Sequence, residues 1–120
     1  MNNLIFYDKY GNRILWLSDK DNETLYDFSG NAVAYIYGNS IYSFKGKHLG
    51  FYENGWVLNN NGYYVLFTQE ATGGIVRPVK KISPIIGIAR TKPIKMTKSI
   101  KPVKPVKKLQ WDDADYFLNN

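Results

Sequence analysis

Short apolar runs and polar clusters alternate along residues 4–68 in a pattern that repeats four times. Four segments align without gaps: FYDKYGNRILWL from Phe6, LYDFSGNAVAYI from Leu25, IYSFKGKHLGFY from Ile41 and VLNNNGYYVLFT from Val57. Each segment consists of an apolar start, a polar turn, a glycine and a second apolar run. Two short apolar runs around a polar turn are typical of a β-hairpin, so the sequence predicts four hairpins with about eight short antiparallel strands.

Each predicted turn combines a short polar residue at its first position with a glycine at its fourth. The polar residues are Asp8, Asp27, Ser43 and Asn59, and the glycines are Gly11, Gly30, Gly46 and Gly62. The polar side chains can accept hydrogen bonds from the turn amides, and glycine supplies the positive φ of a type I turn with a G1 bulge. We therefore interpret these residues as turn formers rather than catalytic acids.

One aligned position in the second apolar run is aromatic in all four hairpins. Its residues are Trp16, Tyr35, Phe51 and Phe67. Aromatic residues at strand spacing usually pack, so we expect these four to form a ring in the core. Because isolated hairpins are marginally stable, four of them should pack around a pseudo-fourfold axis. The predicted fold class is all-β, in keeping with the aromatic and β-branched enrichment.

A different pattern, with a period of three, begins at Val76 and continues to Leu109. Every third residue is aliphatic or Thr, the residue before it is often Pro, and the residue after it is often Lys. This period fits polyproline II rather than an α-helix or a strand. We expect the aliphatic ridge to dock on an apolar surface while the lysines face water. The ridge residues expected to pack are Ile94, Ile100, Val103 and Val106.

The expected path of this segment follows from its length. Fully extended, it would span on the order of 100 Å, more than a compact unit of 70 residues. It must fold back, wrap around the hairpins or reach a second copy, and residues 85–91 (IIGIART) are the favoured point of reversal. For residues 111–120 we expect one amphipathic turn or short helix that packs on the rest of the fold through Trp111, Tyr116 and Phe117.

The net charge of +6 divides the chain into three zones. Residues 1–70, the predicted hairpin domain, have a net charge of −2. Residues 71–110, the extended segment that packs on this domain or on a partner, have +11, and residues 111–120 have −3. Basicity is thus a property of one segment. Its candidate interaction residues are Arg77, Lys80, Lys81, Arg90, Lys92, Lys95, Lys98, Lys101, Lys104, Lys107 and Lys108.

The composition argues against several kinds of site. The chain has no Cys and only one His, His48, which removes disulfides, Cys-ligated zinc, Cys nucleophiles and His-rich metal sites. We expect no cofactor. The chain start lacks the pattern of a signal peptide, and no apolar run approaches the length of a membrane span. We therefore expect a cytoplasmic protein without an integral membrane segment.

Several of these features together resemble a known family. They are the YDxxGN turns, the stretch FKGKHLGFYENGWVLNNNGYYVLFT, the Gly-Gly pair and the Lys-Pro-aliphatic tail. In this combination, over nearly the whole chain, the sequence resembles the bacterial 4-fold β-flower proteins. The resemblance implies a fourfold arrangement of hairpins and carries over no catalytic residue. The fourth repeat departs from the pattern, because Leu58 replaces Tyr and NNNG replaces the Asp turn.

Three classes of function are compatible with the sequence. The favoured hypothesis is a non-catalytic binding or assembly module that uses the lysine-rich segment, with self-association through the tail as one form. The alternative is binding of nucleic acid or of an anionic membrane surface through the same lysines. An enzyme is the least favoured class: His48 follows a turn, and Asp8 and Asp27 would form a carboxylate pair only if two turns met.

Overall fold

The structure is a computed structural model that describes residues 3–119. Nine strands and one helix follow one another within these residues. They are β1 (Leu4–Tyr7), β2 (Arg13–Leu17), β3 (Thr24–Tyr26), β4 (Ala32–Tyr37), β5 (Ser40–Tyr42), β6 (His48–Glu53), β7 (Trp56–Asn59), β8 (Tyr63–Phe67), β9 (Lys108–Trp111) and α1 (Ala114–Leu118).

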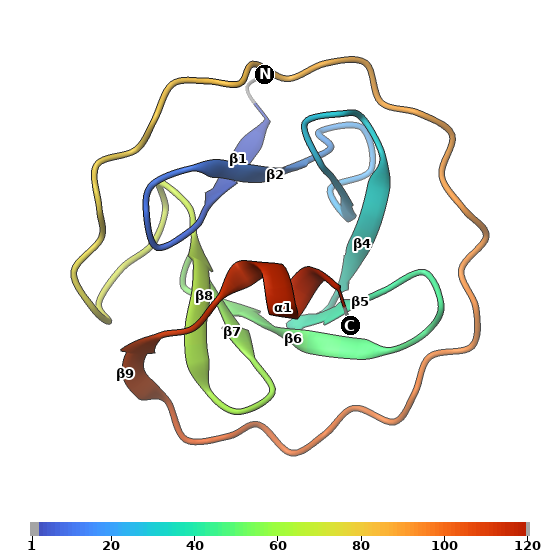
Figure 1. The fold of residues 1–120 in the computed structure, drawn as a ribbon. Helices are drawn as coiled ribbons and strands as arrows, with labels where there is room; N and C mark the ends of the chain where they lie inside the picture. The colour runs from blue at the N-terminus through green and yellow to red at the C-terminus, as the bar shows by residue number, and fades with distance from the viewer. Residues whose placement is uncertain (1–2, 120) are drawn as a thin grey trace.

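The first eight strands form a closed antiparallel barrel. Each strand pairs with the next along the chain, and β8 returns to β1 through the pair Tyr7–Phe67. The four hairpins β1–β2, β3–β4, β5–β6 and β7–β8, here called the petals, surround a common centre that α1 crosses (Figure 1). The molecule measures 36 × 36 × 23 Å, a disc with two equal dimensions. The predicted all-β fold of four hairpins about a pseudo-fourfold axis is confirmed.

The petal tips form as the sequence predicts. In the first petal, Asp8 Oδ1 accepts hydrogen bonds from the backbone N–H groups of Tyr10 and Asn12, and the Gly11 N–H donates to the Asp8 carbonyl. The strand register shifts at the same aligned position in all four petals, as a G1 bulge requires. All four tip glycines have a φ between 81° and 91°. The predicted turn residues therefore serve their structural role.

The barrel interior is filled by the residues next to the predicted aromatic ring. The main buried cluster contains Phe6, Leu25, Ile41 and Val57, which open the four repeats, together with Leu15, Ala34, Leu49, Val65, Leu66, Ala114 and Phe117. Side chains alternate between the two faces of a strand, so the neighbouring aromatic residues face the outside of the barrel. A narrow eight-stranded barrel has room for one layer of mostly aliphatic side chains.

The four aromatic residues expected as a ring are buried, but they do not form one ring around the axis. Each lies at a join between two petals, opposite a residue near the start of the next repeat. The pairs are Trp16–Tyr26, Tyr35–Tyr42, Phe51–Leu58 and Phe67–Tyr7. In three of them the two rings stack, with centroids 4.7 to 6.0 Å apart. The aromatic residues thus bind each petal to its neighbour.

Residues 76–107, here called the belt, run around the outside of the four petals (Figure 1). The belt has neither helix nor strand and makes no reversal at residues 85–91, so that expectation is wrong. Backbone N–H groups at intervals of nine residues, beginning in the belt and ending at Lys108, donate to the carbonyls of the four tip glycines. These bonds are Lys81–Gly11, Arg90–Gly30, Ser99–Gly46 and Lys108–Gly62, with N···O distances of 2.7 to 3.0 Å. This spacing carries the chain from tip to tip in one circuit.

The C-terminal end fastens the circuit where it began. Strand β9 pairs in parallel with β8, and Trp111 packs against Trp56 and Phe67. Phe117 is buried in the main cluster, as predicted. Tyr116, however, is 72% exposed, so its expected docking is wrong. A helix as short as α1 has one buried stripe, and Ala114 and Phe117, three residues apart, fill it.

Substitution of a tip glycine, which the belt contacts, should cost more stability than substitution of a glycine that the belt does not contact. In Gly46→Ala the new Cβ would lie 1.9 Å from the Thr97 carbonyl oxygen, whereas in Gly38→Ala nothing described lies within 4 Å. Both sites have positive φ, so the belt contact is the main difference. Urea unfolding should show G46A destabilised by about 1–3 kcal/mol more than G38A. Equal losses would contradict the close approach of the belt to the tip.

Candidate functional site: the two sides of the belt

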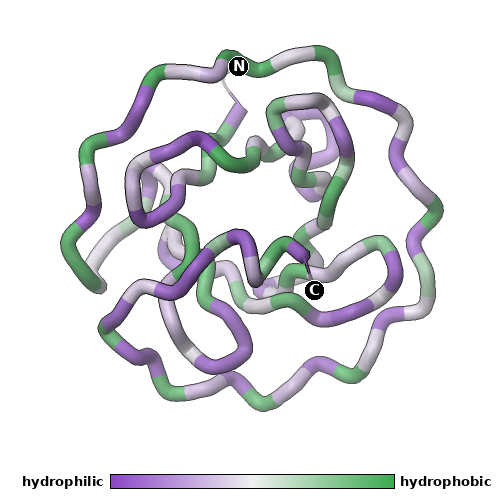
Figure 2. Tube along the Cα trace, in the orientation of Figure 1, coloured by the Kyte–Doolittle hydropathy of each residue, from purple (hydrophilic) through white to green (hydrophobic). Residues whose placement is uncertain are grey.

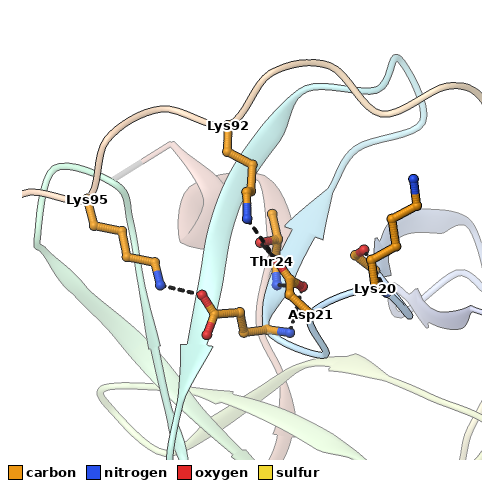
Figure 3. A network of polar contacts seen from close by, with 7 residues as sticks. Lys20, Asp21, Thr24, Lys92 and Lys95 are labelled. Carbon is orange, nitrogen blue, oxygen red and sulfur yellow. Dashed lines mark hydrogen bonds and ion pairs between the residues drawn. The ribbon is translucent and has the colours of Figure 1, made fainter.

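The basic side chains of the belt turn toward the petals. Lys92 binds Asp21 at 3.1 Å, Lys95 binds Glu23, and Lys104 and Lys107 both bind Glu53, the latter at 3.0 Å. Figure 3 shows Lys92 and Lys95 reaching from the belt to the loop between β2 and β3. The lysines therefore neutralise carboxylates of the acidic hairpin domain.

Other basic side chains lie over aromatic rings of the petals. The Lys95 ammonium is 4.5 Å from the Tyr35 ring centroid, and Lys98 is 4.5 Å from that of Tyr37. Such cation–π contacts suit the amphipathic lysine side chain, whose methylene stem can cover apolar surface. Further contacts are Arg77 with Trp56, Lys101 with Phe51 and Asn39, Lys108 with Tyr63 and the Asn61 carbonyl, Lys81 with Asn12, and Arg90 with the Ser29 carbonyl.

Ten of the eleven predicted interaction residues thus contact the petals or the chain nearby. The eleventh, Lys80, lines a hollow beside Tyr7 and Arg13. The sequence predicted which residues share one side of the segment, but it placed the lysines on the wrong side. The petal surface under the belt carries carboxylates and ring faces, and this surface favours ammonium groups over methyl groups.

The aliphatic side chains form a ridge on the outer side of the belt. Its members are Val76, Val79, Ile82, Ile85, Ile88, Ile94, Ile100, Val103, Val106 and, at the start of β9, Leu109, and each is at least 67% exposed. The expected packing of Ile94, Ile100, Val103 and Val106 is therefore wrong. Hydrophobic and hydrophilic positions alternate around the whole circuit in Figure 2. The ridge is the main apolar feature of the rim.

Hydrogen bonds shift the pKa of two carboxyl groups that the belt reaches. Burial raises the pKa of Asp21, but the Thr24 hydroxyl, the backbone N–H groups of Thr24 and Glu23, and the Lys92 ammonium outweigh it and hold the pKa well below its usual range. Burial also raises the pKa of Glu53, and Lys104 and Lys107 together outweigh it and lower that pKa. Both carboxylates are therefore fixed in their charged form as anchors for the belt.

The belt and the tips also share a nine-residue repeat that the triplet interpretation missed. Belt carbonyl oxygens lie 1.9 to 2.3 Å from the place where a Cβ on each tip glycine would be. They belong to Val79, Ile88, Thr97 and Val106, again nine residues apart. One signal was present in the sequence, because Pro84, Pro93 and Pro102 have the same spacing. Three triplets therefore correspond to one petal.

His48 is a buried packing residue, 5% exposed, at the start of β6. Its Nδ1 lies 2.8 Å from Asn60 Oδ1, and its Nε2 lies 2.9 Å from the Ser40 hydroxyl. Because the Asn60 amide N–H₂ donates to the His48 carbonyl, Asn60 Oδ1 is left to accept from Nδ1–H, and Nε2 then accepts from Ser40. Both ring nitrogens are occupied, which makes His48 a poor candidate for a general base.

The carboxylates of residues 3–119 form neither a catalytic pair at Asp8 and Asp27 nor a metal site. Asp8 and Asp27 each accept hydrogen bonds from their own turns. In this range no three His, Asp or Glu side chains gather as a metal site would require. Nor does the described chain contain a helix with the length and apolar character needed to cross a bilayer.

Mild acid should destabilise the protein through His48. Burial and the nearby charge of Lys101 lower the His48 pKa below 6.5, although the Asn60 hydrogen bond opposes them. The unfolded chain then binds the proton more readily, so stability falls as the pH drops below about 6.5. Urea unfolding at pH 7.5 and pH 5 should show a loss that is smaller in His48→Gln. An equal pH dependence in both proteins would exclude this role for His48.

The comparisons with known proteins agree with this architecture. A family model described as "4-fold beta flower protein" matches residues 5–117. No curated protein and no solved structure matches the chain significantly. The matched range includes all of the four petals except Leu4, the whole belt, β9 and most of α1. The chain therefore belongs to the 4-fold beta flower protein family.

Proposed function

We propose that this protein is a non-catalytic binding or assembly module whose contact surface is the aliphatic ridge of the belt. The observation that carries the proposal is the exposure of ten aliphatic side chains around one rim. Burying an exposed Val, Leu or Ile side chain is worth about 1.5–3 kcal/mol, so a partner that covered several of them would gain considerable free energy. Exposed apolar surface of this extent is typical of interaction sites.

Preorganisation supports the same role. The belt is already held at the four tips and by lysine contacts, so a partner would not have to order a free chain. We further propose that the belt approximates polyproline II. At about 3.1 Å per residue, the 32 residues of the belt extend about 100 Å, slightly less than the perimeter of about 110 Å of a disc 36 Å across. Ridge side chains would then recur about every 9 Å.

The alternative functions have less support. Phosphate binding would use lysine ammonium groups, and most of those in the belt already contact carboxylates, carbonyls or rings of the petals. A phosphate would have to compete with these contacts. Catalysis by His48 would require breaking one of its two hydrogen bonds. For these reasons the ridge, rather than the lysines or His48, is the proposed working surface.

Photo-crosslinking tests the ridge directly. A photoreactive residue at Ile94 should give adducts of discrete mass in cells of the source organism, because this position is 90% exposed on the ridge. The same residue at Tyr10, which is 64% exposed at a petal tip, serves as the control and should give none. No adduct from Ile94, or equal adducts from Tyr10, would contradict the proposal.

A second variant separates binding from folding. The double substitution Ile100→Ser and Val103→Ser removes two neighbouring ridge side chains that are more than 90% exposed. It should abolish the adducts formed from Ile94 and leave the free energy of unfolding, measured in urea, within about 0.5 kcal/mol of the wild-type value. Adducts that persist in this variant would show that the ridge does not make the contact.

A further inference from the structure

One arc of the belt, residues 82–89, lacks charge. Elsewhere between Arg77 and Lys108 a basic residue recurs after at most two uncharged ones, whereas eight uncharged residues separate Lys81 from Arg90. Three members of the ridge, Ile82, Ile85 and Ile88, lie on this arc and are 79 to 91% exposed. The arc is therefore the one apolar stretch of the rim without interleaved cations.

The arc also departs from the nine-residue repeat on its inner side. Where the other spans place inward cations such as Lys95 and Lys98, this span has Ile86 and Ala89. Ile86 packs partly buried against the cluster that contains Trp16 and Tyr26. Hollows of about 460 and 490 Å³ lie under this part of the belt, and Ile86 lines both of them. This span therefore lacks the inward cations that hold the rest of the belt against the petals.

The backbone of the arc is unpaired along most of its length. The flanking N–H groups of Lys81 and Arg90 bond to the tips, and Arg13 donates to the carbonyls of Lys81 and Pro84. Within residues 3–119, no backbone carbonyl accepts from the N–H groups of Ile82, Ser83 and residues 85–89, and Pro84 has no N–H. Unpaired N–H groups on an exposed apolar segment are available for pairing with another chain, as those of an edge strand are.

We propose that the arc of residues 82–89 binds the same arc of a second copy of this chain, in antiparallel orientation about a twofold axis. This inference rests on the proposed function, because it uses part of the ridge as the contact. Charge selects both the occupant and the arc. Elsewhere on the belt the lysines that pair with petal carboxylates still have 39 to 48% of their side chains exposed, so two belts that met there would bring cations near one another. Within the arc only uncharged side chains meet, and a twofold contact is self-complementary.

The size of the contact sets its strength. Stable interfaces bury about 800 Å² on each partner, and an arc of eight residues on a convex rim covers less than that. Two discs meet only near their point of tangency, so one arc cannot be supplemented by its neighbours. The dimer should therefore be weak and concentration-dependent.

Sedimentation velocity over a wide range of protein concentration tests the inference. The wild type should shift from monomer toward dimer as concentration rises, and Ile85→Lys should remain monomeric because it places cations face to face. The matched control Ile100→Lys changes a ridge position that is 95% exposed outside the arc, and it should dimerise to the same extent as the wild type. A wild type that is monomeric throughout, or an I85K that still dimerises, would overturn the inference.

Disulfide trapping gives an independent measurement, because the chain contains no cysteine. Under mild oxidation Ile85→Cys should form a covalent dimer several-fold faster than Ile100→Cys. Equal rates would overturn the twofold contact. If Ile94 forms adducts with a different protein while I85C does not form a dimer, the self-contact is wrong and the proposed function stands. If Ile94 forms no adduct and I85C forms no dimer, both the self-contact and the proposed function are wrong.

Discussion

The architecture depends on the hydrogen bonds between the circuit of the belt and the four tip glycines. Each glycine carbonyl accepts one N–H, and a carbonyl two residues earlier in the circuit occupies the space that a Cβ would need. Each tip therefore requires glycine for two reasons: its φ is positive, and a second backbone approaches it closely. Since the bonds recur every nine residues, the fourfold repeat of the petals is copied onto a segment with no hairpin of its own.

Fixing every ninth N–H also determines how the remaining side chains are distributed. In a chain with a period of three, once one position faces the petals, the other two have defined directions. The lysines then lie over Asp21, Glu23, Glu53 and the tyrosine rings, and the aliphatic residues face outward. Exposed ion pairs are individually weak, so the arrangement depends on many contacts acting together. This arrangement leaves the aliphatic side chains of the ridge in water, which is unfavourable, and a partner that covered them would remove this cost.

Features that depend on residues close together in the sequence could be predicted. Features that depend on a surface formed only by the folded barrel could not. The hairpins and their tips were predictable because Asp8 and Gly11, or Asn59 and Gly62, act within four residues of one another. The segregation of the belt was also predictable from its period. Which side faced inward was not, because Glu53 and Tyr35 meet the belt only after the barrel has closed. The outward direction of Trp16 was missed for a similar reason: strand alternation fixes two faces without saying which is the interior.

Native-state hydrogen exchange resolved to single amides tests the central claim, that the belt is fastened to the petals at nine-residue intervals. The amides of Lys81, Arg90, Ser99 and Lys108 should exchange slowly, and those of Ile85 and Ile94 should exchange rapidly under the same conditions. Protection that recurs with this period would confirm the tip bonds. Uniformly rapid exchange from Val76 to Lys107 would show a free arm and contradict the account.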